Sequence, residues 1–172
     1  MTDRADPVDV RLRRWTDADL AILEAGNSPE MTRHLGGPES TAEVRRRHER
    51  YLRGWDLGMP RMFAAVSTAG RPLGSVGWWE STFQERDVYE LGWLVLPAAQ
   101  GRGAATAMTR LAVADAIAQG DGRDLMACPS VDNAASNGVC RAAGFTLVET
   151  STETFRGVEM TLNFWVRPGV SR

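Results

Sequence analysis

The sequence contains no lysine, because all 20 of its basic residues are arginine. Without lysine, the chain can form neither a P-loop nor the Schiff base that pyridoxal phosphate requires. The 20 basic residues face 22 acidic ones, which leaves a formal net charge of -2. No excess of positive charge is available to neutralise a phosphate backbone, so we do not expect nucleic-acid binding.

Cysteine is also scarce. Cys128 and Cys140 are too few for a disulfide scaffold, and their spacing from His34 and His48 fits no zinc pattern. We therefore expect no metal site. The first ten residues hold no apolar signal-peptide core, and no stretch approaches 18 consecutive apolar residues, so we expect a cytoplasmic protein that does not enter a membrane.

The composition is that of one globular domain. The 172 residues are 43% hydrophobic and 24% charged, and a chain of this length and composition can bury a core without disulfides or metals to stabilise it. We expect a flexible lead-in at residues 1–9, a single domain at 10–167 and a short tail at 168–172.

Hydrophobic periodicity predicts an α/β fold of the α+β type. The sheet is expected to be twisted, mixed and mainly antiparallel, with about seven strands and about four flanking helices. Strands are predicted near residues 10–12, 62–66, 73–79, 88–96, 125–128, 145–154 and 158–166. Helices are predicted near residues 16–26, 40–58, 103–118 and 134–143. The polar segment 81–87 is interpreted as a turn.

The most informative segment is a glycine-rich turn between a strand and a helix, at residues 94–105. Such a turn leaves backbone N–H groups free at the positive end of the helix dipole, where a phosphate or pyrophosphate can bind. Gly101 and Gly103 would allow a close approach and positive φ angles. The alternative is an ordinary connection between a strand and a helix, in which the glycines serve the turn alone. A Rossmann fingerprint is disfavoured because its third glycine is Thr106 here.

Three motifs together resemble the GNAT N-acetyltransferases, a family that binds acetyl-CoA. Gln100-x-x-Gly103-x-Ala105 matches the family pattern at the turn. Asn133-x-x-Ser136, followed by Gly144-Phe145, matches a later segment. Residues 90–94 resemble the branch that contains the RimJ- and RimL-like ribosomal-protein N-terminal acetyltransferases. The resemblance spans roughly residues 10–167 and implies the family fold, with acetyl-CoA as co-substrate.

The resemblance also implies roles for individual residues. The backbone of Trp93, Leu94 and Val95 would pair with the pantetheine arm, and an N–H there would polarise the thioester carbonyl. The N–H groups that would hold the pyrophosphate belong to Gly101, Arg102, Gly103, Ala104, Ala105 and Thr106. Asn133 would bind the pantetheine arm, act as a helix N-cap, or do both.

One position departs from the family pattern. Many members carry a tyrosine seven residues after the asparagine, where it protonates the departing CoA thiolate, and this chain has Cys140 there. A thiol has a suitable pKa for the same task. Cys140 could instead be a covalent nucleophile, or a small buried side chain without a catalytic role.

The attacking amine must also lose a proton, which requires a base. Glu90 is the first candidate and Glu80 the second, and either could instead be a solvated strand carboxylate. Gly92 is predicted to form a β-bulge that opens the sheet. Trp78, Trp79 and Trp93 either belong to the core or line the acceptor site.

The sequence thus predicts an enzyme that transfers acetyl from acetyl-CoA to a primary amine, by direct attack in a ternary complex. The alternatives are another acyl-CoA donor, such as succinyl-CoA, or an inactive CoA-binding regulatory module. The expected partner is a small-molecule or peptide amine, and the question of a homodimer stays open.

Overall fold

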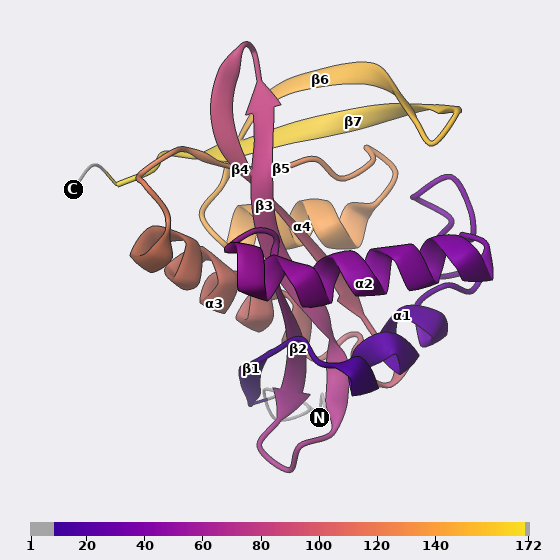
Figure 1. The fold of residues 1–172 in the computed structure, drawn as a ribbon. Coiled ribbons are helices and arrows are strands. Elements are labelled where there is room, and N and C mark those ends of the chain that lie inside the picture. Colours follow the sequence, from indigo (N-terminus) through magenta and orange to yellow (C-terminus); the bar gives the residue numbers. More distant parts are fainter. Residues whose placement is uncertain (1–8, 171–172) are drawn as a thin grey trace, which may run out of the picture.

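The computed structural model describes residues 9–170 and shows one seven-stranded sheet with helices on both faces (Figure 1). Most of the expected lead-in, residues 1–8, and the end of the expected tail, 171–172, lie outside the described residues. The strands are β1 (Val10–Arg14), β2 (Arg61–Ser67), β3 (Pro72–Phe83), β4 (Arg86–Val95), β5 (Leu125–Ala127), β6 (Thr146–Phe155) and β7 (Val158–Arg167). The helices are α1 (Leu20–Ala25), α2 (Thr41–Leu57), α3 (Ala104–Gln119) and α4 (Ala134–Ala142), with short 3₁₀ turns at Asp17–Asp19 and Pro97–Ala99. This order confirms the predicted fold class.

The strands lie in the order β1-β2-β3-β4-β5-β7-β6. Every neighbouring pair is antiparallel except β4 and β5, which are parallel. Strands β2, β3 and β4 therefore form the antiparallel meander that their short polar connections favour. The parallel pair needs a crossover, which α3 supplies between β4 and β5.

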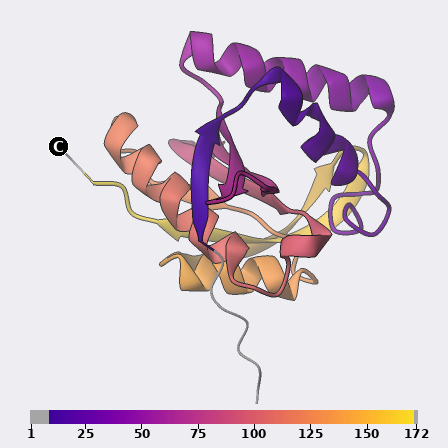
Figure 2. The ribbon, with the colours of Figure 1, turned by 90° about the horizontal axis from the view of Figure 1, so that it is seen from below.

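Two apolar layers hold the fold together, one on each face of the sheet. Figure 2 shows α1 and α2 on one face and α3 and α4 on the other. The apolar run of β2 serves both layers, because its side chains alternate between the faces. Phe63 and Ala65 join the cluster beneath α3 and α4, while Met62, Ala64 and Val66 join the cluster beneath α1 and α2.

Sequence signals at the helix ends agree with the structure. Ser40 and Glu43 form the predicted capping box of α2, and Gly58 ends this helix with a left-handed φ of 89°. Within residues 9–170, no helix is long and apolar enough to cross a membrane.

The predicted turn at residues 81–87 is wrong. Strands β3 and β4 continue into this segment, with Ser81 paired to Val88 and Phe83 paired to Arg86. Only Gln84 and Glu85 form the turn, and both have positive φ angles. Polar side chains favour a loop, but this hairpin extends to an exposed tip, where the side chains of strand residues can face solvent. Phe83 stacks on Phe164 of β7 at 5.1 Å between ring centroids.

The predicted β-bulge at Gly92 is also wrong. The pairing of β3 with β4 is continuous, and Gly92 lies directly opposite Gly77. The reason for glycine is instead a close side chain, because a Cβ at Gly92 would lie 2.7 Å from the ring of Trp79. The sheet nevertheless opens near this position, for a different reason.

Candidate functional site

The sheet divides where β4 and β5 separate, and we call this point the fork. Strand β5 pairs with β4 only at Tyr89 and Glu90. The chain then follows β7, since Asn163 donates its N–H to the Pro129 carbonyl and Val131 donates to the Thr161 carbonyl. Among residues 9–170, therefore, no strand pairs with the last residues of β4 on their β5 side.

Two hydrogen bonds determine which amides of β4 face this open edge. The Tyr89 N–H donates to the Asp124 carbonyl on the β5 side, and the Leu96 N–H donates to the Leu73 carbonyl on the β3 side. Because these directions alternate along a strand, Trp93 and Val95 direct their amides to the open edge. The amide of Leu94 faces β3. The open edge thus offers alternate peptide groups to an extended amide-bearing ligand.

The glycine-rich turn follows the open edge directly. Gly101 and Gly103 have φ angles of 70° and 77°, so both need the conformational freedom of glycine. A Cβ on either would meet no atom of the described residues within 4 Å. Ala104 begins α3 and is buried in the core, whereas Ala105 and Thr106 are half-buried and Arg102 is exposed. The first N–H groups of α3 lack intrahelical acceptors, as in any helix, and no acidic residue lies in its first turn. An anion therefore fits this turn.

Gln100 fastens the turn to the strand. Its Nε2 donates to the Val95 carbonyl at 3.0 Å and lies 3.3 Å from the Met31 sulfur. One carbonyl of the open edge thus already has a partner within the protein. Sequence reasoning missed Met31, because the contact depends on the position of the segment between α1 and α2.

Glu90 lies at the fork on the face covered by α1 and α2. Its carboxylate accepts hydrogen bonds from the Ser81 hydroxyl at 3.0 Å and from the Cys128 thiol at 3.3 Å. Its side chain is half-buried. Neither Ser81 nor Cys128 was a sequence candidate, because only the strand register reveals that they surround Glu90.

Glu80 lies elsewhere. It is opposite Tyr89 and therefore faces the α3 side of the sheet, where Arg123 donates to its carboxylate at 3.1 Å. Its side chain is 59% exposed. The structure thus separates the two candidate bases and leaves Glu90 alone at the fork.

Cys140 is fully buried in the cluster beneath α3 and α4. Burial raises the pKa of its thiol to about 12. Burial also raises the pKa of Cys128, and the negative charge of Glu90 raises it further. Both thiols therefore stay protonated near neutral pH, which makes them poor nucleophiles.

Asn133 is the N-cap of α4, because its side-chain oxygen accepts the Ser136 N–H at 3.0 Å. Its neighbour Asn137 was not a sequence candidate, although it is buried and its polar atoms all have partners. Asn137 donates to the Ser130 carbonyl at 2.9 Å and accepts from Trp165 at 2.8 Å. These bonds connect α4 to β7 and to the segment that leaves the fork.

The predicted tryptophans have different environments. Trp78 belongs to the core, where its Nε1 donates to Asp115 at 2.8 Å. Trp79 and Trp93 are only partly buried and pack on opposite faces of the sheet. The side chain of Trp79 covers Gly92, next to the open edge.

A seven-stranded sheet whose fork is followed by a glycine-rich turn that suits an anion defines a recognisable class of protein. The family model described as an acetyltransferase (GNAT) domain matches residues 9–146, which is most of the chain. The chain therefore belongs to the GNAT acetyltransferase family, and the protein is an acetyltransferase. The comparison with curated proteins finds no match.

Solved structures share this fold at low sequence identity. A spermidine N-acetyltransferase from Vibrio cholerae, in complex with CoA and spermine, has a TM-score of 0.78 at 18% identity and covers 94% of this chain and 96% of its own. YncA, a putative acetyltransferase from Salmonella typhimurium with acetyl-CoA, has a TM-score of 0.74 at 22% identity, with coverages of 92% and 93%. A Salmonella typhimurium enzyme that modifies the N-terminal serine of ribosomal protein L7/L12 has a TM-score of 0.74 at 19% identity, with coverages of 93% and 95%. These likenesses show that the chain shares the fold of these acetyltransferases.

Proposed function

We propose that the protein transfers an acetyl group from acetyl-CoA to a primary amine, by direct attack within a ternary complex. The observation that carries this proposal is the open edge of β4, which leads without interruption into the left-handed glycine turn before α3. Amides along an edge suit a pantetheine arm, and free N–H groups at a helix start suit a pyrophosphate. Acetyl-CoA would supply the activated thioester.

The residues of the open edge divide the binding work between them. The backbone of Trp93 and Val95 would pair with the pantetheine amides, and an N–H there would stabilise the oxyanion that forms during attack. Leu94 would contribute its side chain rather than its amide. The N–H groups of residues 101–106 would hold the pyrophosphate. Asn133 would use its side-chain NH₂ for the pantetheine arm, because its oxygen already caps α4.

Glu90 would take the proton from the amine, directly or through water. Its place at the fork supports this role, and Ser81 and Cys128 hold its carboxylate in position. The buried thiol of Cys140 would serve as core packing. The C–S bond of the tetrahedral intermediate can then break, and the CoA thiolate, whose thiol has a pKa of about 8.5, takes its proton from solvent or from the protonated nitrogen of that intermediate.

A turnover assay tests this proposal. Acetyl-CoA is mixed with the protein and one of three amines: spermidine, an aminoglycoside, or a peptide with a free N-terminal serine. Release of free CoA with any of them supports the proposal, and a parallel run with succinyl-CoA tests the acyl group. Tight CoA binding without turnover of any amine would favour a regulatory module instead.

A matched pair of variants tests the base. Glu90→Gln should lower kcat/KM for the amine by about 10²- to 10⁴-fold, or by about tenfold if a water chain relays the proton. Glu80→Gln removes the same charge from the adjacent strand, on the other face, and should change kcat/KM by less than about twofold. Both variants should keep the wild-type affinity for CoA. The reverse order of effects would show that Glu90 is not the base.

A further inference from the structure

The hairpin between β6 and β7 ends in a turn whose first residue is unfavourable for that turn. Phe155 pairs with Val158, which leaves Arg156 and Gly157 as a two-residue turn with φ angles of 53° and 78°. A turn with two positive φ angles favours Asn-Gly, because a long side chain is strained in the left-handed region. Arg156 therefore contradicts the local preference, and such a residue is expected to have a role elsewhere in the structure through its side chain.

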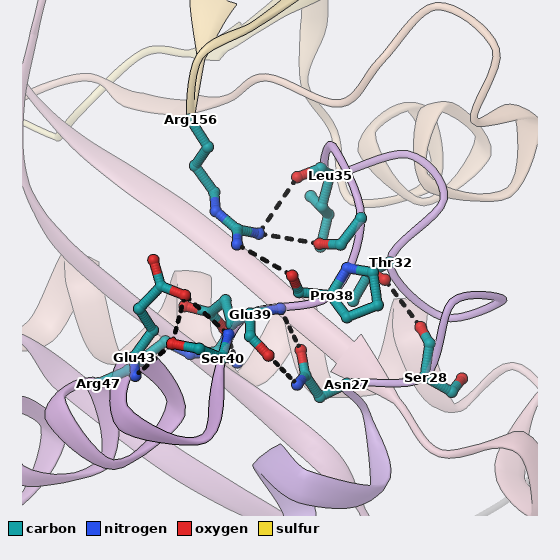
Figure 3. A network of polar contacts seen from close by, with 11 residues as sticks. Asn27, Ser28, Thr32, Leu35, Pro38, Glu39, Ser40, Glu43, Arg47 and Arg156 are labelled. Carbon is teal, nitrogen blue, oxygen red and sulfur yellow. Dashed lines mark hydrogen bonds and ion pairs between the residues drawn. The ribbon is translucent and has the colours of Figure 1, made fainter.

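The Arg156 side chain reaches across to the segment between α1 and α2, residues 26–40, which we call the α1–α2 loop. Nη1 donates to the carbonyls of Gly37 at 3.0 Å and Leu35 at 3.4 Å, and Nη2 donates to that of Pro38 at 3.4 Å. Figure 3 shows these three carbonyls converging on one guanidinium group. Three main-chain acceptors on one side chain fix the position of a loop, rather than of another side chain.

The base of the α1–α2 loop is fixed separately. The Asn27 side chain donates to the Glu39 carbonyl at 2.7 Å and accepts the Glu39 N–H at 2.8 Å (Figure 3). These two bonds join residues near the two ends of the loop and close its base. The carbonyls that contact Arg156 belong to residues 35–38, which directly precede Glu39, so Arg156 holds the side of the loop that leads into this base.

The α1–α2 loop spans the open edge of β4. It begins at Gly26, where a Cβ would collide with the Leu94 side chain, and its Met31 contacts Gln100. Its residues 35–38 meet the β6–β7 hairpin, and both ribbon views place these two segments side by side (Figures 1 and 2). Leu94 and Glu90 lie on the same face of β4, so the loop contacts β4 on the face from which Glu90 would meet the amine.

We propose that Arg156 is a latch that holds the α1–α2 loop closed over the amine side of the fork. Arg156 is a positioning residue, since its contacts are with the loop and not with the reacting atoms. The inference rests on the proposed function, because that function identifies the molecule that passes beneath the loop as the amine. The hydrogen bonds of Arg156 go to residues 35–38 and not to the turn at residues 101–106 that would bind pyrophosphate, so the latch should govern the amine and not CoA.

Arg156→Asn separates the latch from the stability of the fold. Asparagine suits the left-handed turn position and is too short to reach the loop, so the hairpin should be as stable as in the wild type or more stable. Gln84→Asn is the matched control, because Gln84 is the first residue of the other two-residue turn, with a φ of 50°. It suits that turn and gives up the hydrogen bond from Gln84 to Glu149 at 2.7 Å, so it also removes a long-range side-chain contact, but one outside the α1–α2 loop.

Hydrogen exchange, thermal unfolding and steady-state kinetics should be measured on both full-length variants, using the fastest of the three amines. In Arg156→Asn, amides of residues 33–38 should exchange at least about fivefold faster. The KM for the amine should rise about five- to tenfold, with kcat and the Kd for CoA within about twofold of wild type. The melting temperature should not fall. Gln84→Asn should change neither the exchange of 33–38 nor the KM.

Unchanged exchange at residues 33–38 in Arg156→Asn would overturn the latch, and so would faster exchange with an unchanged KM. Arg156→Lys, which keeps the charge but loses the forked geometry, should fall between the wild type and Arg156→Asn in both measurements. If the wild type turned over no amine while the exchange difference persisted, the proposed function would fail and the latch contact itself would stand.

Discussion

Replacement of Gly103 by glutamate should abolish useful binding of CoA while the protein remains folded. Gly103 is exposed at the start of α3 and has a φ of 77°. In the part of the chain that the structure describes, no atom lies within 4 Å of the position that a Cβ would take, so the new side chain has room there. Its effect on folding is then limited to the cost of a left-handed residue, about 1–2 kcal/mol.

The effect on binding is larger, because the carboxylate would enter the proposed pyrophosphate site. Two like unit charges about 5 Å apart repel by about 3 kcal/mol at an effective dielectric constant of about 20, and by about 1 kcal/mol in water. An exposed turn lies between these limits. About 2 kcal/mol corresponds to a loss of affinity of about 30-fold, before any steric effect is added.

Gly70→Glu provides the matched control. Gly70 also has a φ of 77° and open space at its Cβ, but it lies in the turn between β2 and β3. The two variants should lose similar stability in urea denaturation, and only Gly103→Glu should lose CoA affinity in calorimetric titration. Affinity within about threefold of wild type in Gly103→Glu, or equal losses in both variants, would refute the assignment of the pyrophosphate site.

Three further outcomes follow from the burial of single groups. Cys140→Ala should keep at least about a tenth of the activity and lose about 1 kcal/mol of stability. Intact mass spectrometry should find no acetyl adduct on the wild type after it is mixed with acetyl-CoA. Because burial raises the pKa of Cys140 from 9.0 to about 12, its thiol stabilises the fold fully below pH 9 and loses this contribution as the pH rises toward 12. Wild-type unfolding free energy should therefore fall more steeply over that range than that of Cys140→Ala, and parallel curves would contradict the burial argument. Asp115→Ala should lower the free energy of unfolding in urea by about 2–4 kcal/mol, because the Arg61 guanidinium and the Trp78 N–H, which donate to Asp115 at 2.8 Å, lose their acceptor. Asp56→Ala is the control, because it breaks an exposed ion pair and should cost less than about 0.5 kcal/mol.

Local sequence signals determined the elements of this protein and the chemistry of its turn. The capping box at Ser40 and the N-cap at Asn133 need only contacts within three residues, so they could be predicted directly. The left-handed glycines before α3 are similarly local. Short apolar runs predicted which segments form the strands of the sheet, because a strand that is buried on both faces carries apolar residues at successive positions.

Tertiary structure decided which predicted residues meet. The fork arises because the chain after β5 pairs with β7, and this long-range pairing leaves no local trace. The same register places Glu90 beside Ser81 and Cys128, sends Glu80 to the opposite face, and buries Cys140 in the core. Arg156 shows most clearly what the sequence alone does not predict. Its sequence position predicts a hairpin turn, yet its side chain binds a loop more than 100 residues earlier, and only the packed fold brings the two together.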